Sequence, residues 1–166
     1  ALLNQIFEDE AFGSIQYKHM PFVLSPFLSR LFSKFLNPSQ KDFEKERYHG
    51  DNILISQNSP ECFDETFWIK ENINYYNEPL NSNRQITQEI LQAYEYFLNK
   101  HALEQEKRFL VVKNNNNHIR LSKLSEYFKN SIFIVLFRNP LHQSLSLLKT
   151  HRRLSELQKK DKNILV

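Results

Sequence analysis

The spacing of apolar residues along the chain predicts a series of helices. Between Gln85 and His101, apolar side chains recur every three or four residues, which is the period of an amphipathic helix. Ser25 and Pro26 mark the start of another helix, because serine caps a helix and proline fits its first turn. These signals predict helices at residues 1–8, 26–36, 85–101, 119–128 and 140–160, and a short helix opened by Ser59-Pro60-Glu61.

Two continuous apolar runs, 109–112 and 132–137, predict buried strands. Strands that are apolar on both faces are typical of parallel sheets, and the helix predicted at 119–128 would connect these two by a right-handed crossover. A third, short strand is predicted at 14–17. The predicted fold class is therefore α/β with a parallel sheet, in a single domain that covers residues 1–166.

The composition is that of an ordinary globular domain. Of 166 residues, 40% are hydrophobic and 25% are charged, and the formal net charge is only +3, which permits an anionic ligand without requiring nucleic acid. No apolar run approaches the roughly 20 residues of a membrane span, and no signal peptide is visible. Cys62 is the only cysteine, so no intramolecular disulfide is possible and a reducing, cytoplasmic location is predicted.

A basic and a hydroxyl side chain follow the second apolar run at a spacing that suits an anion. Arg138-Asn139-Pro140 comes directly after residues 132–137, and Ser146 follows the arginine by eight residues. The predicted strand delivers Arg138 to the carboxyl edge of the sheet, where open α/β sheets bind their ligands. A guanidinium fork and a hydroxyl near the start of a helix suit a phosphate group.

The segment from Val135 to Ser146 resembles the 3'-phosphate-binding motif of sulfotransferases that use 3'-phosphoadenosine 5'-phosphosulfate (PAPS). In that family an arginine at a strand end and a serine eight residues later hold the 3'-phosphate of the cofactor. Matched position by position, these are Arg138 and Ser146. The resemblance implies a parallel-sheet three-layer sandwich of the P-loop type, truncated at both ends, that transfers a sulfuryl group to a hydroxyl or amine without a metal.

The phosphosulfate-binding loop of that family, a Ser-Gly-Thr-Thr-like turn between a strand and a helix, has no counterpart here. The resemblance places it immediately before Ala1, because the residues from Leu2 to Phe7 resemble the helix that follows such a loop. The chain also lacks an initiator methionine, so we expect it to be an internal fragment that binds the cofactor poorly by itself. Similarity to bacterial members of the family extends over Tyr17 to Phe22 and from His49-Gly50-Asp51 through Ser59-Pro60-Glu61 to Phe67-Trp68.

The resemblance also implies catalytic candidates, because sulfuryl transfer needs a base for the proton of the acceptor and a cation for the leaving phosphate. His19 lies where some members of the family place a catalytic glutamate. His118 lies in the loop after the strand at 109–112, where other members place a histidine near a lysine, and Lys113 corresponds to that lysine. Asn114 to Asn117 is predicted to be a polar loop. Both histidines are candidates for the base, and His19 is ranked ahead of His118.

Other functions stay open at this point. The first is a nucleotide kinase or another P-loop protein, which a Gly-Lys-Ser/Thr sequence upstream would favour. The second is a non-catalytic module that binds through its basic C-terminal helix, although modest charge and the lack of interleaved aromatic residues argue against nucleic acid. The sequence leaves the acceptor class and the oligomeric state open. The cations of that helix and its tail are Lys149, Arg152, Arg153, Lys159, Lys160 and Lys162.

Overall fold

The chain divides into two compact units, each of which is described by itself. Unit 1 joins Ala1–Phe43 to Gln57–Phe133, and unit 2 joins Glu44–Ser56 to Ile134–Val166. The segment from His49 to Asp51, which contributes to the resemblance described above, lies outside the described residues. The residues that the computed structural model describes are 2–36, 44–46, 54–71 and 85–160.

The helices of unit 1 largely follow the periodicity of the sequence, which confirms the helices predicted at 1–8, 26–36, 85–101 and 119–128. The longest of them begins after Thr87, whose hydroxyl oxygen accepts a hydrogen bond from the N–H of Ile90 and so caps the helix. The helices are α1 (Leu2–Phe7), the 3-10 helix η1 (Tyr17–His19), α2 (Pro26–Leu36), α3 (Glu65–Lys70), α4 (Gln88–Glu104) and α5 (Asn117–Tyr127).

The helix predicted to open at Ser59-Pro60-Glu61 begins later, as α3 at Glu65, so its predicted start is wrong. Tertiary pairing explains the difference. Pro60 forms an antiparallel bridge with Gln16, and the N–H of Glu61 donates to the carbonyl of Ile15 at 3.0 Å. The backbone is therefore held extended beside the chain that leaves the sheet, and this pairing overrides the local signal of serine followed by proline.

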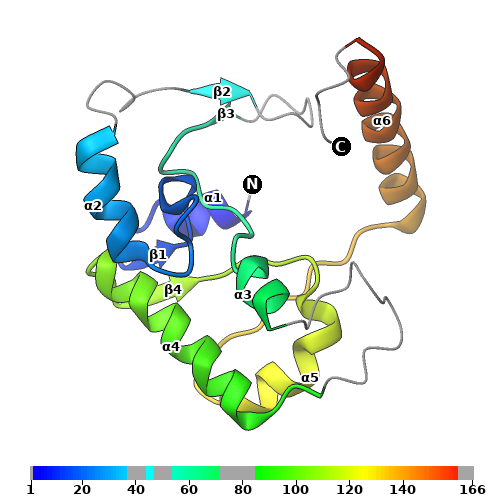
Figure 1. The fold of residues 1–166 in the computed structure, drawn as a ribbon. Coiled ribbons are helices and arrows are strands. Elements are labelled where there is room, and N and C mark those ends of the chain that lie inside the picture. Colours follow the sequence, from blue (N-terminus) through cyan, green and yellow to red (C-terminus); the bar gives the residue numbers. More distant parts are fainter. Residues whose placement is uncertain (1, 37–43, 47–53, 72–84, 161–166) are drawn as a thin grey trace. The chain divides into compact units, whose positions relative to one another are not determined.

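Unit 1 contains a parallel pair of strands, β1 (Phe12–Ser14) and β4 (Phe109–Val111). Ser14 lies opposite Val111, and its hydroxyl donates to the carbonyl of that residue at 2.9 Å. Helix α4 packs against both strands (Figure 1). The strand predicted at 109–112 is confirmed, and the one predicted at 14–17 lies two residues earlier. The parallel pair agrees with an α/β class, while the three-layer P-loop-type sandwich stays a prediction.

The core of unit 1 is built mainly from aromatic rings of α3 and α4. The ring centroids of Phe67 and Phe97 are 5.5 Å apart, and those of Trp68 and Tyr94 are 4.5 Å apart. Tilted and offset pairs at these distances stabilise a core beyond the burial of their area. The buried hydrophobic residues are Ile15, Val23, Phe67, Trp68, Leu91, Tyr94, Phe97 and Leu124.

Helix α2 directs its apolar stripe away from this core. Its buried residues include Ser29, whose hydroxyl donates to the carbonyl of His19 at 2.8 Å. Phe27 and Leu31 are instead about half exposed, at 50% and 52%. The helix is thus where the sequence predicts it, but a hydrogen bond to η1 decides which of its faces turns inward.

Unit 2 contains a short antiparallel pair and one long helix. Strands β2 (Lys45–Glu46) and β3 (Leu54–Ile55) pair with each other, and α6 (Pro140–Lys160) matches its predicted bounds. The side-chain oxygen of Asn139 accepts hydrogen bonds from two N–H groups of the first turn of α6 and caps it. Although α6 has 21 residues, neither it nor any other described helix is long and apolar enough to cross a membrane.

Residues 132–137 do not form the predicted buried strand. The structure assigns no strand to them, and their side chains are exposed, from 38% for Phe133 to 93% for Phe137. A strand needs a neighbouring chain to pair its N–H and C=O groups. In the described part, β4 pairs with β1 and no described strand pairs with residues 132–137. The apolar composition of residues 132–137 suits a buried strand, but a strand also needs a neighbouring strand to pair with.

The aromatic core gives the first testable prediction. Replacing Phe67 by alanine should lower the free energy of unfolding by about 3–5 kcal/mol, because it leaves a cavity among fully packed rings. The matched control is Phe27→Ala on α2, which should change stability by less than about 0.5 kcal/mol because the ring is half exposed. Urea unfolding followed by circular dichroism measures both, and equal effects would contradict the assigned core.

Candidate functional site

The carboxyl ends of the parallel strands gather several of the predicted site residues. β1 ends at Ser14 and leads into η1, while β4 ends at Val111 and leads through a short loop into α5 (Figure 1). Because the strands are parallel, these connections leave the sheet at the same edge, which is the edge where α/β proteins bind ligands. The loop after β4 carries Lys113, and α5 carries His118 near its start.

Lys113 forms a partly exposed ion pair at this edge. Its ammonium nitrogen lies 2.9 Å from Oε1 of Glu61, and 40% of its side chain is exposed. The same carboxylate oxygen accepts the N–H of Cys62 at 3.0 Å, which fixes its position. An ammonium group has three donors, so Lys113 is able to hold Glu61 and an anionic ligand together. Burial raises the pKa of the Cys62 thiol, which disfavours a reactive thiolate.

A buried ion pair lies directly behind this loop. The guanidinium of Arg120 donates from Nη2 to Oε1 of Glu65 and from Nη1 to Oε2, both at 2.8 Å. Arg120 is only 1% exposed and lies over the ring of Trp68, 4.6 Å from its centroid. Burial raises the pKa of Glu65, but the hydrogen bonds from Arg120 and Asn114 outweigh it, so that the pKa lies below its ordinary value. The pair is therefore a carboxylate and a guanidinium.

Asn114 ties the loop after β4 to this ion pair. Its side-chain nitrogen donates to Oε2 of Glu65 at 2.8 Å, and its side-chain oxygen accepts the N–H of Asn116 at 2.8 Å. The predicted polar loop thus has at least one amide directed inward. Glu65 and Arg120 are not among the site residues predicted from the sequence. The sequence does contain one signal that Arg120 is buried, which is its spacing: it lies one turn before the buried Leu124 and so on the same inward face of the helix.

Asp64 is a second buried carboxyl group beside this pair. It is fully buried, and the hydroxyl of Tyr94 donates to its Oδ2 at 2.9 Å. Burial raises the pKa of Asp64 to about 6, which the hydrogen bonds to Asn114 and Tyr94 only partly oppose. Buried in this way, Asp64 serves the packing of α3 against α4 rather than contact with a substrate.

His19, a candidate base, is fully buried, and both of its ring nitrogens are bonded. Nδ1 accepts the backbone N–H of Gln16 at 3.0 Å, which assigns the proton to Nε2, and Nε2 lies 3.2 Å from Oε2 of Glu104. The lone pair that a base would use is therefore already bonded. The ring of His101 packs edge-on against His19 at 4.6 Å. This geometry does not support a catalytic role for His19 and favours a structural one.

His118 is exposed and lies in the first turn of α5. Its Nδ1 lies 2.7 Å from the carbonyl oxygen of Asn115, which assigns the proton to Nδ1 and the basic lone pair to Nε2. Of the two predicted bases, His118 is the one that is exposed.

Arg138 and Ser146 belong to unit 2. Arg138 is exposed and lies directly before the Asn139 cap, and Ser146 is partly buried in the second turn of α6. The predicted phosphate-binding pair thus lies in one continuous segment, with Arg138 before α6 and Ser146 within it, and neither side chain is sealed from solvent. His19, Lys113 and His118 belong to unit 1.

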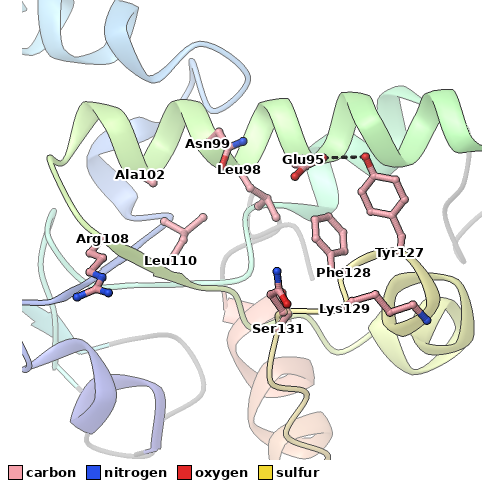
Figure 2. Close-up of a pocket in the computed structure, with 11 residues that line it drawn as sticks. Glu95, Leu98, Asn99, Ala102, Arg108, Leu110, Tyr127, Phe128, Lys129 and Ser131 are labelled. Atoms are coloured by element: carbon pink, nitrogen blue, oxygen red, sulfur yellow. Dashed lines mark hydrogen bonds between the residues drawn. The ribbon is translucent and has the colours of Figure 1, made fainter.

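Unit 1 also has a pocket of about 540 Å³ (Figure 2). One face of α4 forms its upper wall, and Phe128 and Ser131, beyond the end of α5, point into it. The hydroxyl of Tyr127 donates to Oε2 of Glu95 at 2.7 Å across one side. The pocket is of ligand-binding size, but Arg108 and Leu110 place it toward the amino end of β4, and none of the predicted site residues lines it.

Within the described ranges, no group of three or more histidine, cysteine, aspartate and glutamate side chains is placed to hold a metal ion. A scan against family models, a search of curated proteins and a search of solved structures each find no match to the chain. The proposed function below therefore rests on the residues and their geometry.

The buried ion pair gives the second prediction. Arg120→Ala should lower the free energy of unfolding by about 3–5 kcal/mol, because it leaves the carboxylate of Glu65 buried without its partner. The matched control is Lys123→Ala on the same helix, where the pair with Glu126 is exposed and should contribute less than about 1 kcal/mol. Denaturant titration at pH 7 measures both variants. A small loss for Arg120→Ala would refute the assigned pair.

The third prediction concerns pH and His101. Its Nε2 lies 2.8 Å from the carbonyl oxygen of Val23, and burial, with His19 nearby, lowers its pKa to about 4. Between about pH 6.5 and pH 4 the unfolded chain binds a proton at His101 that the folded chain does not, so stability should fall as the pH falls through this window.

His101→Gln should reduce this acid-dependent loss, whereas His142→Gln, at an exposed position, should leave it unchanged. Urea midpoints at pH 7 and pH 4.5 provide the measurement. An unchanged slope in His101→Gln would show that this histidine is protonated in the folded protein.

Proposed function

We propose that the chain is part of an enzyme that transfers a sulfuryl group from PAPS to a hydroxyl or amine acceptor. The observation that carries the proposal is the segment that contains Arg138, the Asn139 cap and Ser146. It combines an exposed guanidinium directly before a capped helix with a hydroxyl two turns into that helix. The planar fork of arginine matches the oxygens of a phosphate better than a point charge does.

The residues of the proposal divide the chemistry between them. Arg138 and Ser146 bind the 3'-phosphate of the cofactor. The acceptor oxygen or nitrogen attacks sulfur in line, its proton passes to a base, and the bond between sulfur and the bridging phosphate oxygen breaks. His118 is the proposed base, since its basic nitrogen is Nε2. Lys113 supplies a cation for the charge that develops on the leaving 5'-phosphate.

The polar edge of the parallel strands supports this assignment independently. Lys113 and His118 both lie in the connection that follows the carboxyl end of β4, which is where an α/β sheet places the groups that contact a ligand. The acceptor class and the oligomeric state do not follow from these residues.

The fourth prediction tests the proposal by binding. Arg138→Ala should weaken binding of 3'-phosphoadenosine 5'-phosphate at least tenfold, because a hydrogen-bonded charge contributes about 1.5–3 kcal/mol. Ser146→Ala should weaken binding severalfold. Arg152→Ala is the matched control, since it removes an exposed arginine from the same helix. Isothermal titration calorimetry measures all three.

Two results would count against the sulfotransferase. The first is the absence of binding by the unmodified protein. The second is tight, magnesium-dependent binding of ATP in its place, which would favour a nucleotide kinase. Equal losses in Arg138→Ala and Arg152→Ala would indicate general electrostatic attraction to a basic helix rather than a specific phosphate site.

A further inference from the structure

We infer that Asn114 and Glu65 are positioning residues for Lys113. The inference rests on the proposed function and adds to it a means of holding the cation at the carboxyl edge of β4. Neither side chain is assigned contact with the cofactor or the acceptor. They act through the loop that carries the lysine.

The backbone is fixed on both sides of Lys113. Before it, the carbonyl of Val111 accepts the hydroxyl of Ser14 at 2.9 Å, which anchors the end of β4 to β1. After it, the amide of Asn114 donates to Glu65 at 2.8 Å. The lysine is thus mounted between two anchors, one in the sheet and one in the buried ion pair.

The ammonium group of Lys113 is also held in place, by a side-chain contact. Glu61 lies 2.9 Å from it, and Glu61 is itself placed by its backbone bond to Ile15 next to β1. A free lysine has a flexible stem, and the loss of rotamer entropy when its side chain is ordered opposes binding. A lysine that is already placed stabilises developing charge without that reorganisation. The arrangement therefore favours a cation prepared for an anionic group.

The bond from Asn114 is separable from the stability of the ion pair. Arg120 already contacts both oxygens of Glu65, so the buried charges stay paired when the amide is removed. Asn114→Ala also removes the bonds of the amide to Asp64 and to the N–H of Asn116. Because the buried ion pair stays intact, the variant should keep the fold while it releases the loop. Glu65→Gln is less informative, because it leaves Arg120 as an uncompensated buried charge and destabilises the unit.

The test is a double-mutant cycle on binding of 3'-phosphoadenosine 5'-phosphate. Lys113→Ala should weaken binding about tenfold, and Asn114→Ala should weaken it about three- to fivefold. The double variant should bind no more weakly than Lys113→Ala does, because the amide acts only through the lysine. Asn115→Ala, an exposed asparagine in the same loop, is the control and should bind like the unmodified protein.

The outcomes separate the inference from the function on which it rests. Losses that multiply in the double variant, normal binding by Asn114→Ala, or normal binding by Lys113→Ala would each overturn the positioning role while the proposed function stands. No binding by the unmodified protein would overturn both. Urea unfolding of Asn114→Ala should give a midpoint close to that of Asn115→Ala, and a large drop would assign Asn114 to stability instead.

Discussion

The ion pair between Glu65 and Arg120 is the interaction on which the rest of unit 1 depends. It joins α3 to α5, covers one face of the core ring Trp68, and accepts the amide of Asn114 from the loop after β4. Breaking a buried pair leaves an uncompensated charge, so any arrangement that separates these three segments is disfavoured. The same charges that constrain the packing thereby fix the loop that presents Lys113.

His19 is a second buried polar group, and it connects η1 to the C-terminal end of α4. His19 bonds the backbone of Gln16 and faces Glu104, and the carbonyl of His19 accepts the hydroxyl of Ser29 from α2. Satisfying buried backbone and side-chain groups in this way is what most buried histidines do. The structure therefore separates candidates that look alike in sequence. Both ring nitrogens of His19 are bonded inside the core, whereas His118 is exposed at the start of α5.

Sequence predicted the local elements well and the tertiary ones poorly. Helix α6 matches its predicted bounds, because cap, proline and period all lie within its own residues. The strand predicted at 132–137 and the helix start at Pro60 are wrong, because each depends on a partner strand elsewhere in the chain. Arg120 and Glu65 were missed for a related reason. A charged residue on a predicted helix usually faces solvent, and only its tertiary partner shows that it does not.

The proposed function depends on local structure more than on the tertiary fold. A three-layer sandwich requires residues 132–137 to pair within a larger sheet, which the described residues do not show. The arrangement of Arg138 and Ser146 requires less, namely an arginine directly before a capped helix and a hydroxyl eight residues after that arginine. The structure has that local arrangement. The phosphate-binding proposal is therefore tied to a short continuous segment, and it can be tested whether or not the predicted sheet is correct.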